Sequence, residues 1–474
     1  MERSTAILIA LVAYFVGLLA LGALARTRTH DSAGFYLGGR TLGPWVAALA
    51  ANASSSSAWS LVGTSGFAYL HGLPALWLLP GCVGGFVLNW MVVAPRLRAA
   101  TGDAVTLTDF LAGPPGTPWR RPIVWVSSLL TLASLLVYIA AQMQAAGAAF
   151  AHAFPLSAGL GVVLGAVVTI AYTLLGGYLA ASITDTLQGL LMAGVAVVVP
   201  VAAVAHLGGF GELFAALEHT AGPDHLSVVG GREGFLAIGF AAGLCGIGLG
   251  YPGQPHAVNK FMGMAPGASM RIARTVGIGW AVLLYCGMIV LGWAARAAWQ
   301  LPAGQNEDVL YVASGKLFPP LLDGIVLASI LAAIMSTVDS QLLVCASCVT
   351  HDLRPSARGD KRMLAQARTT VLLIGAGATV AALFLPKNVF DNVLFAWAAL
   401  GSAFGPLLIV RLCRGSVAPA WALGSIVAGG ALAIAGSYAD RWIDGLDRRF
   451  AAGVLSWGVS GLLAWVGSRR NHCN

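Results

Sequence analysis

Charged residues are scarce in this sequence. Asp, Glu, Lys and Arg together make up 10% of its 474 residues, whereas soluble chains carry about 25%. Hydrophobic residues make up 58%, and the mean hydropathy is +0.79. These values exclude a string of soluble domains. They predict one polytopic domain, residues 1–474, embedded in a lipid bilayer.

The sequence also lacks the residue groups that would indicate an enzyme. Cys345 and Cys348 form a C-x-x-C pair, but no histidine or further cysteine is near them, so helix packing is favoured over a metal or redox site. The run Gly63-Thr64-Ser65-Gly66 has the shape of an intramembrane serine protease motif. That chemistry needs a base within hydrogen-bond reach. His71 lies in the turn outside this segment, and no other apolar segment offers a central histidine. We therefore expect no enzymatic activity.

Thirteen segments are apolar and long enough to cross a bilayer as helices. They cover residues 5–25, 44–68, 74–94, 123–150, 157–175, 180–204, 234–251, 273–297, 322–348, 367–385, 388–410, 418–437 and 450–467. An odd number places the termini on opposite sides of the membrane. With the N-terminus outside, 19 of the 27 Lys and Arg residues, Lys260 among them, fall in inside loops, so the positive-inside rule favours this orientation.

A net charge of +8 does not indicate nucleic-acid binding, because the basic residues lie in short loops between apolar segments. Beyond the bilayer and a small-molecule substrate, we expect no partner, and we expect the chain to function as a monomer.

The segment 323–348 carries a polar stripe. Ala333, Ser336, Thr337, Asp339 and Ser340 are spaced by three and four residues, so they share one face of an otherwise apolar helix. A carboxylate at membrane depth costs roughly 3 kcal/mol, so it needs a partner, a proton, a cation or water. The stripe predicts the wall of an ion or substrate path. The alternative is that the hydroxyls bond back to the preceding turn of their own helix.

Two of the thirteen segments contain a stretch that disfavours a continuous helix. Residues 51–60 read ANASSSSAWS, and residues 246–255 contain four glycines and two prolines. Backbone groups freed at membrane depth are tolerated where they line a cavity or bind an ion. The two segments are five spans apart, which is typical of transporters built from two repeats. Because five is odd, the second repeat is inverted. The predicted repeats cover 44–204 and 234–410, with peripheral helices at 5–25 and 418–467.

Five motifs carry a family resemblance. They are F-Y-L-G-G-R-T-L-G-P-W at 35–45, L-L-G-G-Y-L-A-A-S-I-T-D-T-L-Q at 174–188, G-L-G-Y-P-G-Q-P-H at 248–256, L-A-A-I-M-S-T-V-D-S-Q-L-L-V at 331–344 and F-A-W-A-A-L-G-S-A-F-G-P at 395–406. In this order they resemble the sodium:solute symporter family, and within it the bacterial proline symporters. The resemblance implies an all-α, leucine-transporter-type five-plus-five inverted repeat. It also implies Na⁺-coupled import of a small amino acid, foremost proline, across a bacterial inner membrane, with Na⁺ as the co-transported ion.

Carried over residue by residue, the resemblance implies two sets of site residues. The sodium set comprises the backbone carbonyls of Ala53, Ser56 and Ala333 and the hydroxyls of Ser336 and Thr337. These are oxygen ligands, which hard cations prefer. The substrate set comprises Ser57, Tyr138, Tyr251, Gln254 and Pro255. For the two tyrosines, aromatic packing is the alternative.

The chain departs from the proline symporters at two positions. They have an aspartate where this chain has Ser55, and a tryptophan where it has Ile247. The first departure affects the route of sodium coupling, and the second affects pocket shape, because isoleucine offers neither a flat face nor an indole donor. Another small organic solute, proton coupling and a transporter-like membrane sensor therefore stand as alternatives.

Three polar residues in the apolar spans suggest a replacement for the charge missing at Ser55. We hypothesise that Asp185, Asp339 and Ser340 hold a second cation or share a proton. The alternative is that Asp339 only bonds a neighbouring helix. Arg40 matches the family's arginine in the first cytoplasmic loop and is expected to take part in coupling, although it also fits an ordinary positive-inside residue.

Overall fold

A computed structural model describes residues 2–26, 38–102, 104–175, 178–353, 361–386, 388–443 and 445–469. These residues form helices joined by loops, and the extended pairing among them is limited to an isolated bridge between Leu42 and Met264. The long helices are α1 (Arg3–Arg26), α8 (Arg120–Ala153), α9 (Ala158–Leu175), α10 (Tyr178–Leu207), α15 (Met270–Ala298), α17 (Pro320–Ser347), α18 (Lys361–Phe384), α19 (Val389–Arg414), α20 (Pro419–Gly436) and α21 (Ser456–Arg469).

Shorter elements complete the chain. They are η1 (Gly38–Arg40), α3 (Pro44–Ser55), η2 (Trp59–Gly63), α4 (Thr64–His71), η3 (Leu73–Trp77), η4 (Leu79–Val83), α5 (Gly84–Leu88), η5 (Asn89–Val93), α6 (Ala94–Ala100), α7 (Leu107–Ala112), α11 (Phe210–Ala221), α12 (Pro223–Leu226), α13 (Gly234–Gly246), η6 (Ile247–Gly253), α14 (Pro255–Met262), η7 (Asn306–Asp308), α16 (Val309–Leu317), η8 (Cys348–Leu353), η9 (Ala439–Arg441) and η10 (Phe450–Leu455).

The predicted all-α membrane protein is confirmed. Within the described ranges, eleven helices are long and apolar enough to cross a membrane. Of the other two expected segments, 44–68 is divided into α3, η2 and α4, and 157–175 forms α9, whose apolar stretch Ala158–Leu174 is slightly too short to be counted with the eleven. The total of thirteen spans stays a prediction.

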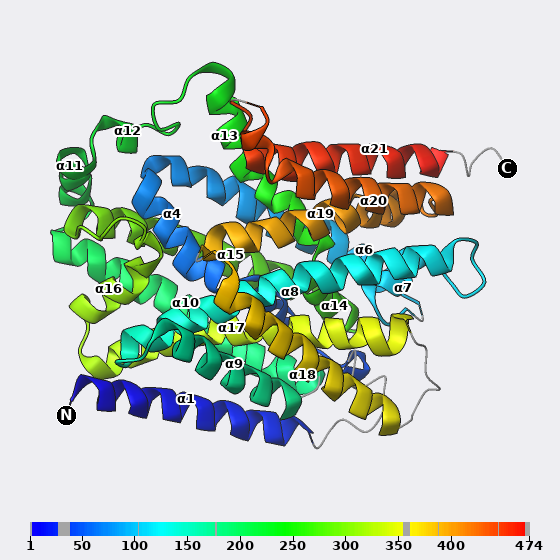
Figure 1. The fold of residues 1–474 in the computed structure, drawn as a ribbon, viewed down its shortest axis with the longest axis horizontal. Helices are drawn as coiled ribbons and strands as arrows, with labels where there is room; N and C mark the ends of the chain where they lie inside the picture. The colour runs from blue at the N-terminus through cyan, green and yellow to red at the C-terminus, as the bar shows by residue number, and fades with distance from the viewer. Residues whose placement is uncertain are drawn as a thin grey trace.

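Helix α17, which carries the polar stripe, lies at the centre of the bundle (Figure 1). In its most apolar window 83% of residues are buried, compared with 28% in α1 and 33% in each of α18, α20 and α21. Helices α1, α3, α8 and α10 pack directly against α17. The outer helices instead expose large apolar side chains, such as Leu373 of α18 at 69% and Leu462 of α21 at 58%. Polar residues inside and apolar residues outside are what a bilayer requires.

Both expected helix interruptions are present. Helix α3 ends at Ser55, because Ser56 takes a non-helical conformation with φ −119° and ψ 90°. The second interruption comes after α13, where η6 contains Pro252 and leads to Gln254 in an extended conformation before α14 begins at Pro255. Helices α14 and α17 both pack against α3, and α19 packs against η6. The two interruptions therefore face the central helices.

Candidate ion and substrate sites

The first polar cluster lies where α17 passes the end of α3. Ser336 Oγ donates to the Ala53 carbonyl at 3.1 Å, and Thr337 Oγ1 lies 3.5 Å from the same oxygen. Ser336 Oγ is also 3.3 Å from the Ala333 carbonyl, and the Ser56 N–H donates to the Ala53 carbonyl at 3.2 Å. The structure thus brings all five predicted sodium-site residues into one connected group. Ser336 bonds both to its own helix and across to α3.

The chemistry of this cluster suits a small cation. Its side-chain groups are hydroxyls, each with two acceptor lone pairs, and the hydroxyl oxygen of Ser56 is buried without a hydrogen-bond partner in the described part of the chain. All of the converging oxygens are neutral, and hard cations prefer oxygen ligands. The cluster could therefore hold a Na⁺ ion through these neutral oxygen atoms.

A second polar cluster lies beside the first and centres on Asp185 of α10. Asp185 Oδ2 accepts a hydrogen bond from Ser54 Oγ at 3.1 Å and forms an ion pair with Lys260 Nζ at 2.9 Å. The Asp185 side chain is completely buried, and that of Lys260 is 1% exposed. Ser54 Oγ is also 3.1 Å from Ser340 Oγ. Ser54 thus links two of the three residues predicted to hold a second cation.

The prediction that Lys260 lies in a loop is wrong. Lys260 was assigned to a cytoplasmic loop, but it lies within α14 and is buried. The apolar segment was expected to end at residue 251, before the extended break, whereas the helix resumes at Pro255 and carries the lysine back into the bundle. Removing Lys260 from the inside loops leaves 18 of 27 basic residues there, so the orientation argument keeps its direction.

Asp339, the third residue of the predicted set, forms no hydrogen bond to Asp185 or Lys260 in the described chain, but its charge interacts with both of them. Its side chain is 1% exposed, and neither carboxylate oxygen has a hydrogen-bond partner among the described residues. An ionised carboxylate in this setting is costly. A proton or a bound cation would remove that cost.

The predicted substrate residues form hydrogen bonds at both helix breaks. Tyr138 of α8 donates to Ser57 Oγ at 3.3 Å, in the break that follows α3. In the other broken helix, Tyr251 and Tyr285 share a hydroxyl hydrogen bond of 2.8 Å. The Gln254 amide donates to the Gly250 carbonyl at 3.1 Å, and its oxygen has no partner in the described chain.

Trp397 of α19 joins these pairs. Its ring centroid lies 4.6 Å from that of Tyr251 and 6.5 Å from that of Tyr138, with edge-to-face geometry in both cases. Its carbonyl accepts a hydrogen bond from the Gln254 amide at 3.0 Å, next to Pro255 at the first turn of α14. All five predicted substrate residues therefore belong to one neighbourhood around Trp397.

A cavity of about 490 Å³ adjoins this neighbourhood. Its lining includes Ile247 of η6, Asp391 and Trp397 of α19, and Arg448, which lies just before η10. The Trp397 indole N–H donates to the Ile247 carbonyl at 3.0 Å, and Arg448 pairs with Asp391 at 2.8 Å. The cavity thus links the broken helix to charged residues at one end of the bundle. An indole does lie against Ile247, but α19 supplies it.

Within the described part of the chain, the two expected coupling residues, Arg40 and Ser55, form no hydrogen bond with either cluster. The Ser55 hydroxyl donates to the carbonyls of Ala51 and Asn52 in its own helix, at 2.8 and 3.1 Å. Arg40 donates to the Gly102 carbonyl at 2.7 Å from a backbone with φ 55°. A role in coupling would have to act through the backbone or in another conformation.

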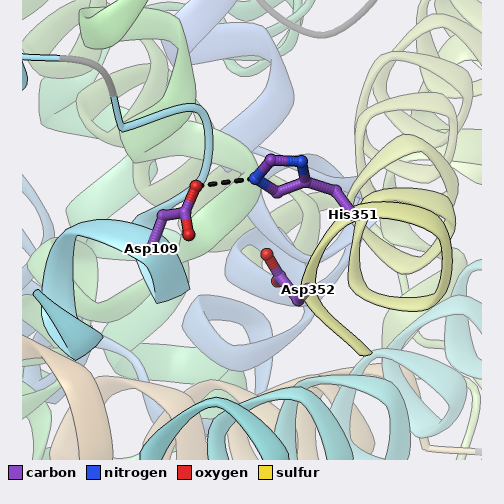
Figure 2. A group of neighbouring side chains, drawn as sticks. All are labelled: Asp109, His351 and Asp352. Carbon is purple, nitrogen blue, oxygen red and sulfur yellow. Dashed lines mark hydrogen bonds and ion pairs between the residues drawn. The ribbon is translucent and has the colours of Figure 1, made fainter. Parts of the chain in front are cut away.

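A separate charged group ties α7 and α8 to η8, beyond the end of α17. Figure 2 shows His351 pointing at Asp109, with a distance of 2.6 Å between Nε2 and Oδ2. Arg120 pairs with the other Asp109 oxygen at 2.6 Å. Burial raises the pKa of Asp109, but the hydrogen bond with His351 and the charges of His351 and Arg120 outweigh it, so the pKa lies below its usual value.

Asp352 completes this group, and Thr106 donates to it at 3.0 Å. Three potential metal ligands therefore lie within 4.8 Å of one another. Both Asp109 oxygens already have cationic or imidazole partners. The group is therefore better described as a set of polar contacts that holds the helices together than as a metal site.

Several residues of the site were not identified from the sequence, among them Ser54, Gln142, Lys260, Tyr285 and Trp397. Ser54 and Trp397 stand inside motifs that were examined, so neighbouring positions could have identified them. Lys260 and Tyr285 become neighbours of Asp185 and Tyr251 only in the folded chain. Gln142 accepts a hydrogen bond from the Ala58 N–H at 3.1 Å and so satisfies a backbone group freed by the break in α3.

The fold and these clusters define a class of protein, the membrane transporters with two interrupted helices packed around a central helical core. The family model for the sodium:solute symporter family matches residues 35–429, and the chain belongs to that family. The osmoregulated proline transporter OpuE of Bacillus subtilis is 36% identical over 426 residues, covering 86% of this chain and 84% of that protein. A sodium/proline symporter of Staphylococcus aureus is 35% identical over 441 residues, covering 90% and 84%.

Among solved structures, a Na⁺-coupled sialic acid symporter in a substrate-bound outward-open state superimposes with a TM-score of 0.78. The two chains share 18% sequence identity, and the match covers 99% of this chain and 98% of that one. The predicted leucine-transporter-type fold is therefore confirmed, as is the conclusion that the protein is a transporter and not an enzyme.

Proposed function

We propose that this protein imports proline, or a closely similar small amino acid, together with Na⁺ by alternating access. The observation that carries the proposal is the oxygen cluster where α17 meets the break in α3, directly beside the Ser57–Tyr138 contact. The relatives named as proline transporters support the choice of substrate.

In this proposal Na⁺ binds the carbonyls of Ala53, Ser56 and Ala333 and the hydroxyls of Ser336 and Thr337. Ion binding then fixes α17 against the end of α3. Because Ser57 follows Ser56 at the same break, the ion orders the backbone that contacts the substrate. This link is the physical basis for coupling, since each ligand stabilises the conformation that the other requires.

The substrate would lie between the two broken helices. A zwitterion such as proline needs polar partners for its charged groups, which the hydroxyls of Ser57 and Tyr138 and the unpaired Gln254 oxygen can supply. Its apolar ring can pack against Tyr251 and Trp397. Gln254 and Pro255 stand at the point where α14 begins, so closure of this half-helix would enclose the substrate.

The membrane arrangement forms part of the proposal. We place the N-terminus outside and the C-terminus in the cytoplasm of a bacterial inner membrane, following the distribution of Lys and Arg. The inverted repeats comprise residues 44–204 and 234–410, and the chain acts as a monomer. In Figure 1 helix α1 begins at one end of the bundle and helix α21 ends at the other, which supports this arrangement.

A proton-coupled variant of this function is the second candidate. It is favoured by Asp339, a buried carboxylate without a hydrogen-bond partner in the described chain. In this version Asp185, Asp339 and Ser340 handle a proton or a second cation in addition to the sodium cluster.

Uptake into proteoliposomes tests the proposal. Purified protein should accumulate labelled proline when an inward Na⁺ gradient is imposed, and only poorly when choline replaces Na⁺. A panel of unlabelled competitors would define the substrate range in the same assay. Uptake that ignores Na⁺ and follows an inward proton gradient would refute sodium coupling and establish the second candidate.

A further inference from the structure

The Lys260–Asp185 pair has the composition of an occupied cation site. The ammonium of Lys260 lies 2.9 Å from Asp185 Oδ2 and 3.3 Å from Ser182 Oγ. It also lies 4.9 Å from the ring centroid of Tyr178, over a face that attracts cations. A carboxylate, a hydroxyl and an aromatic face therefore surround a single positive charge with negligible exposure to solvent.

This charge is adjacent to the sodium cluster. Ser54 donates to the same Asp185 oxygen that holds the ammonium, and it directly follows Ala53, whose carbonyl accepts from Ser336. Ser54 also contacts Ser340, one turn beyond Ser336 on α17. The Lys260 ammonium thus occupies the neighbourhood in which Asp185, Asp339 and Ser340 are predicted to hold a second cation or share a proton.

Electrostatics decide what else this site can hold. A buried carboxylate without a counter-charge is strongly unfavourable, so Asp185 needs one cation in every state of the protein. While Lys260 supplies it, a second Na⁺ beside Asp185 would meet a neighbouring positive charge at close range in a medium of low polarity. The lysine therefore satisfies Asp185 and disfavours a free ion beside it, while Asp339, whose charge interacts with both members of the pair, is left to a proton.

The helix that carries Lys260 gives the ion pair a structural role as well. Lys260 belongs to α14, the half-helix that begins at Pro255 beside the predicted substrate residues. Asp185 belongs to α10, which packs against both α3 and α17. A cavity of about 20 Å³, lined by Lys260, Ser340 and Tyr178, lies beside the pair. The ion pair thus connects the substrate-binding half-helix to the ion-binding helices.

We propose that the ammonium of Lys260 is a tethered cation that permanently replaces a second transported Na⁺, so that one Na⁺ moves with each substrate molecule. The proposal rests on the function proposed above and specifies its stoichiometry. It assigns Asp185 and Ser340 to a resident charge, and it leaves Asp339 as the remaining candidate for a proton.

The test compares variants that keep or remove the charge. Lys260→Met keeps the length of the side chain and removes its charge, and Lys260→Arg keeps the charge. Lys316→Met is the matched control, because Lys316 contacts the Trp299 ring away from both clusters. Binding of ²²Na⁺ to purified protein counts the ions directly and does not depend on transport activity. The ratio of Na⁺ to proline follows from the gradient that just prevents net uptake in proteoliposomes.

We expect one Na⁺ per molecule in the wild type, in Lys260→Arg and in Lys316→Met, and two in Lys260→Met, where the Hill coefficient should rise from about 1 toward 2. A folded Lys260→Met protein that still binds one Na⁺ would overturn the proposal. If Lys260→Met does not fold, the double variant Lys260→Met/Asp185→Asn should fold and bind one Na⁺, because neither charge is present. A double variant that also fails to fold would show that Lys260 is needed for packing, and that outcome overturns the proposal too.

Failure of the proposed function is distinguishable from failure of this inference. If the wild type takes up no proline on a Na⁺ gradient, the substrate or the coupling ion is wrong. The number of ²²Na⁺ ions bound with and without the Lys260 charge still tests the tethered cation on its own.

Discussion

Removing a single hydroxyl from α17 should weaken Na⁺ binding by a predictable amount. Ser336 Oγ lies 3.1 Å from the Ala53 carbonyl, at the centre of the proposed site. A polar contact to a charged group contributes roughly 1.5–3 kcal/mol, and each 1.4 kcal/mol corresponds to about a tenfold change in affinity. Ser336→Ala should therefore raise the Na⁺ concentration for half-maximal proline uptake roughly 10- to 100-fold.

Thr337→Ala should have a smaller effect of the same kind, because Thr337 Oγ1 is farther from the Ala53 carbonyl, at 3.5 Å. Thr337→Ser, which keeps the hydroxyl, should stay close to the wild type. Ser347→Ala is the matched control on the same helix. The Ser347 hydroxyl is buried, and its hydrogen bond among the described residues goes to the Val344 carbonyl of its own helix, at 2.8 Å.

The assay is initial-rate uptake of labelled proline in proteoliposomes over a range of Na⁺ concentrations, with protein content measured in each preparation. Maximal uptake at saturating Na⁺ should change much less than the half-maximal concentration. If Ser336→Ala and Thr337→Ala both keep wild-type Na⁺ dependence, the ion binds elsewhere and the oxygen cluster serves only to pack α17 against α3.

Three further predictions concern the surrounding residues. Tyr138→Phe removes the hydrogen bond to Ser57 and should weaken proline binding roughly fivefold, from the loss of about 1 kcal/mol, with Na⁺ affinity unchanged; a parallel loss of Na⁺ affinity in the uptake assay would refute a role specific to substrate. Asp339→Asn should flatten the pH profile of uptake or alter its ion stoichiometry, and a variant identical to the wild type in both would make Asp339 structural. Because the pKa of Asp109 is lowered on folding, its contribution to stability should be present above the unfolded pKa and be lost as the pH falls through the folded value. Thermal unfolding should show that Asp109→Asn has lost this pH dependence, and an unchanged profile would contradict the assignment.

Much of the fold was predictable because an apolar membrane helix can be recognised from its own stretch of sequence. Low charge, long apolar segments and the two stretches at 51–60 and 246–255 predicted a helical transporter with two interruptions, and both interruptions are present. The polar stripe of α17 was also predictable, because a 3.6-residue period fixes which side chains share a face. The sodium set followed once the stripe and the break in α3 were considered together with the family resemblance.

The features that could not be predicted from the sequence depend on contacts between distant segments of the chain. Ser55 and Ser54 are adjacent serines, yet the hydroxyl of one bonds within its own helix and that of the other reaches Asp185. The rotation of α3 about its own axis decides this difference, because it determines which of the two serines faces α10. Trp397 illustrates the same point, since an indole lies beside Ile247 although the tryptophan expected at that position is absent.

Lys260 shows why a charge cannot be assigned to a loop from its distance to an apolar segment. A lysine after a Gly- and Pro-rich stretch fits a cytoplasmic loop when the stretch is taken as the end of a span. Here the stretch is an interruption, and the helix that follows returns the side chain to the interior beside a carboxylate 75 residues earlier in the chain. The cost of burying Asp185 alone could have suggested such a partner, because a carboxylate at that depth requires a counter-charge. In a transporter with interrupted helices, a lone acidic residue in a span therefore suggests a basic side chain on the half-helix beyond the break. This possibility should be tested before a transported ion is invoked as the counter-charge.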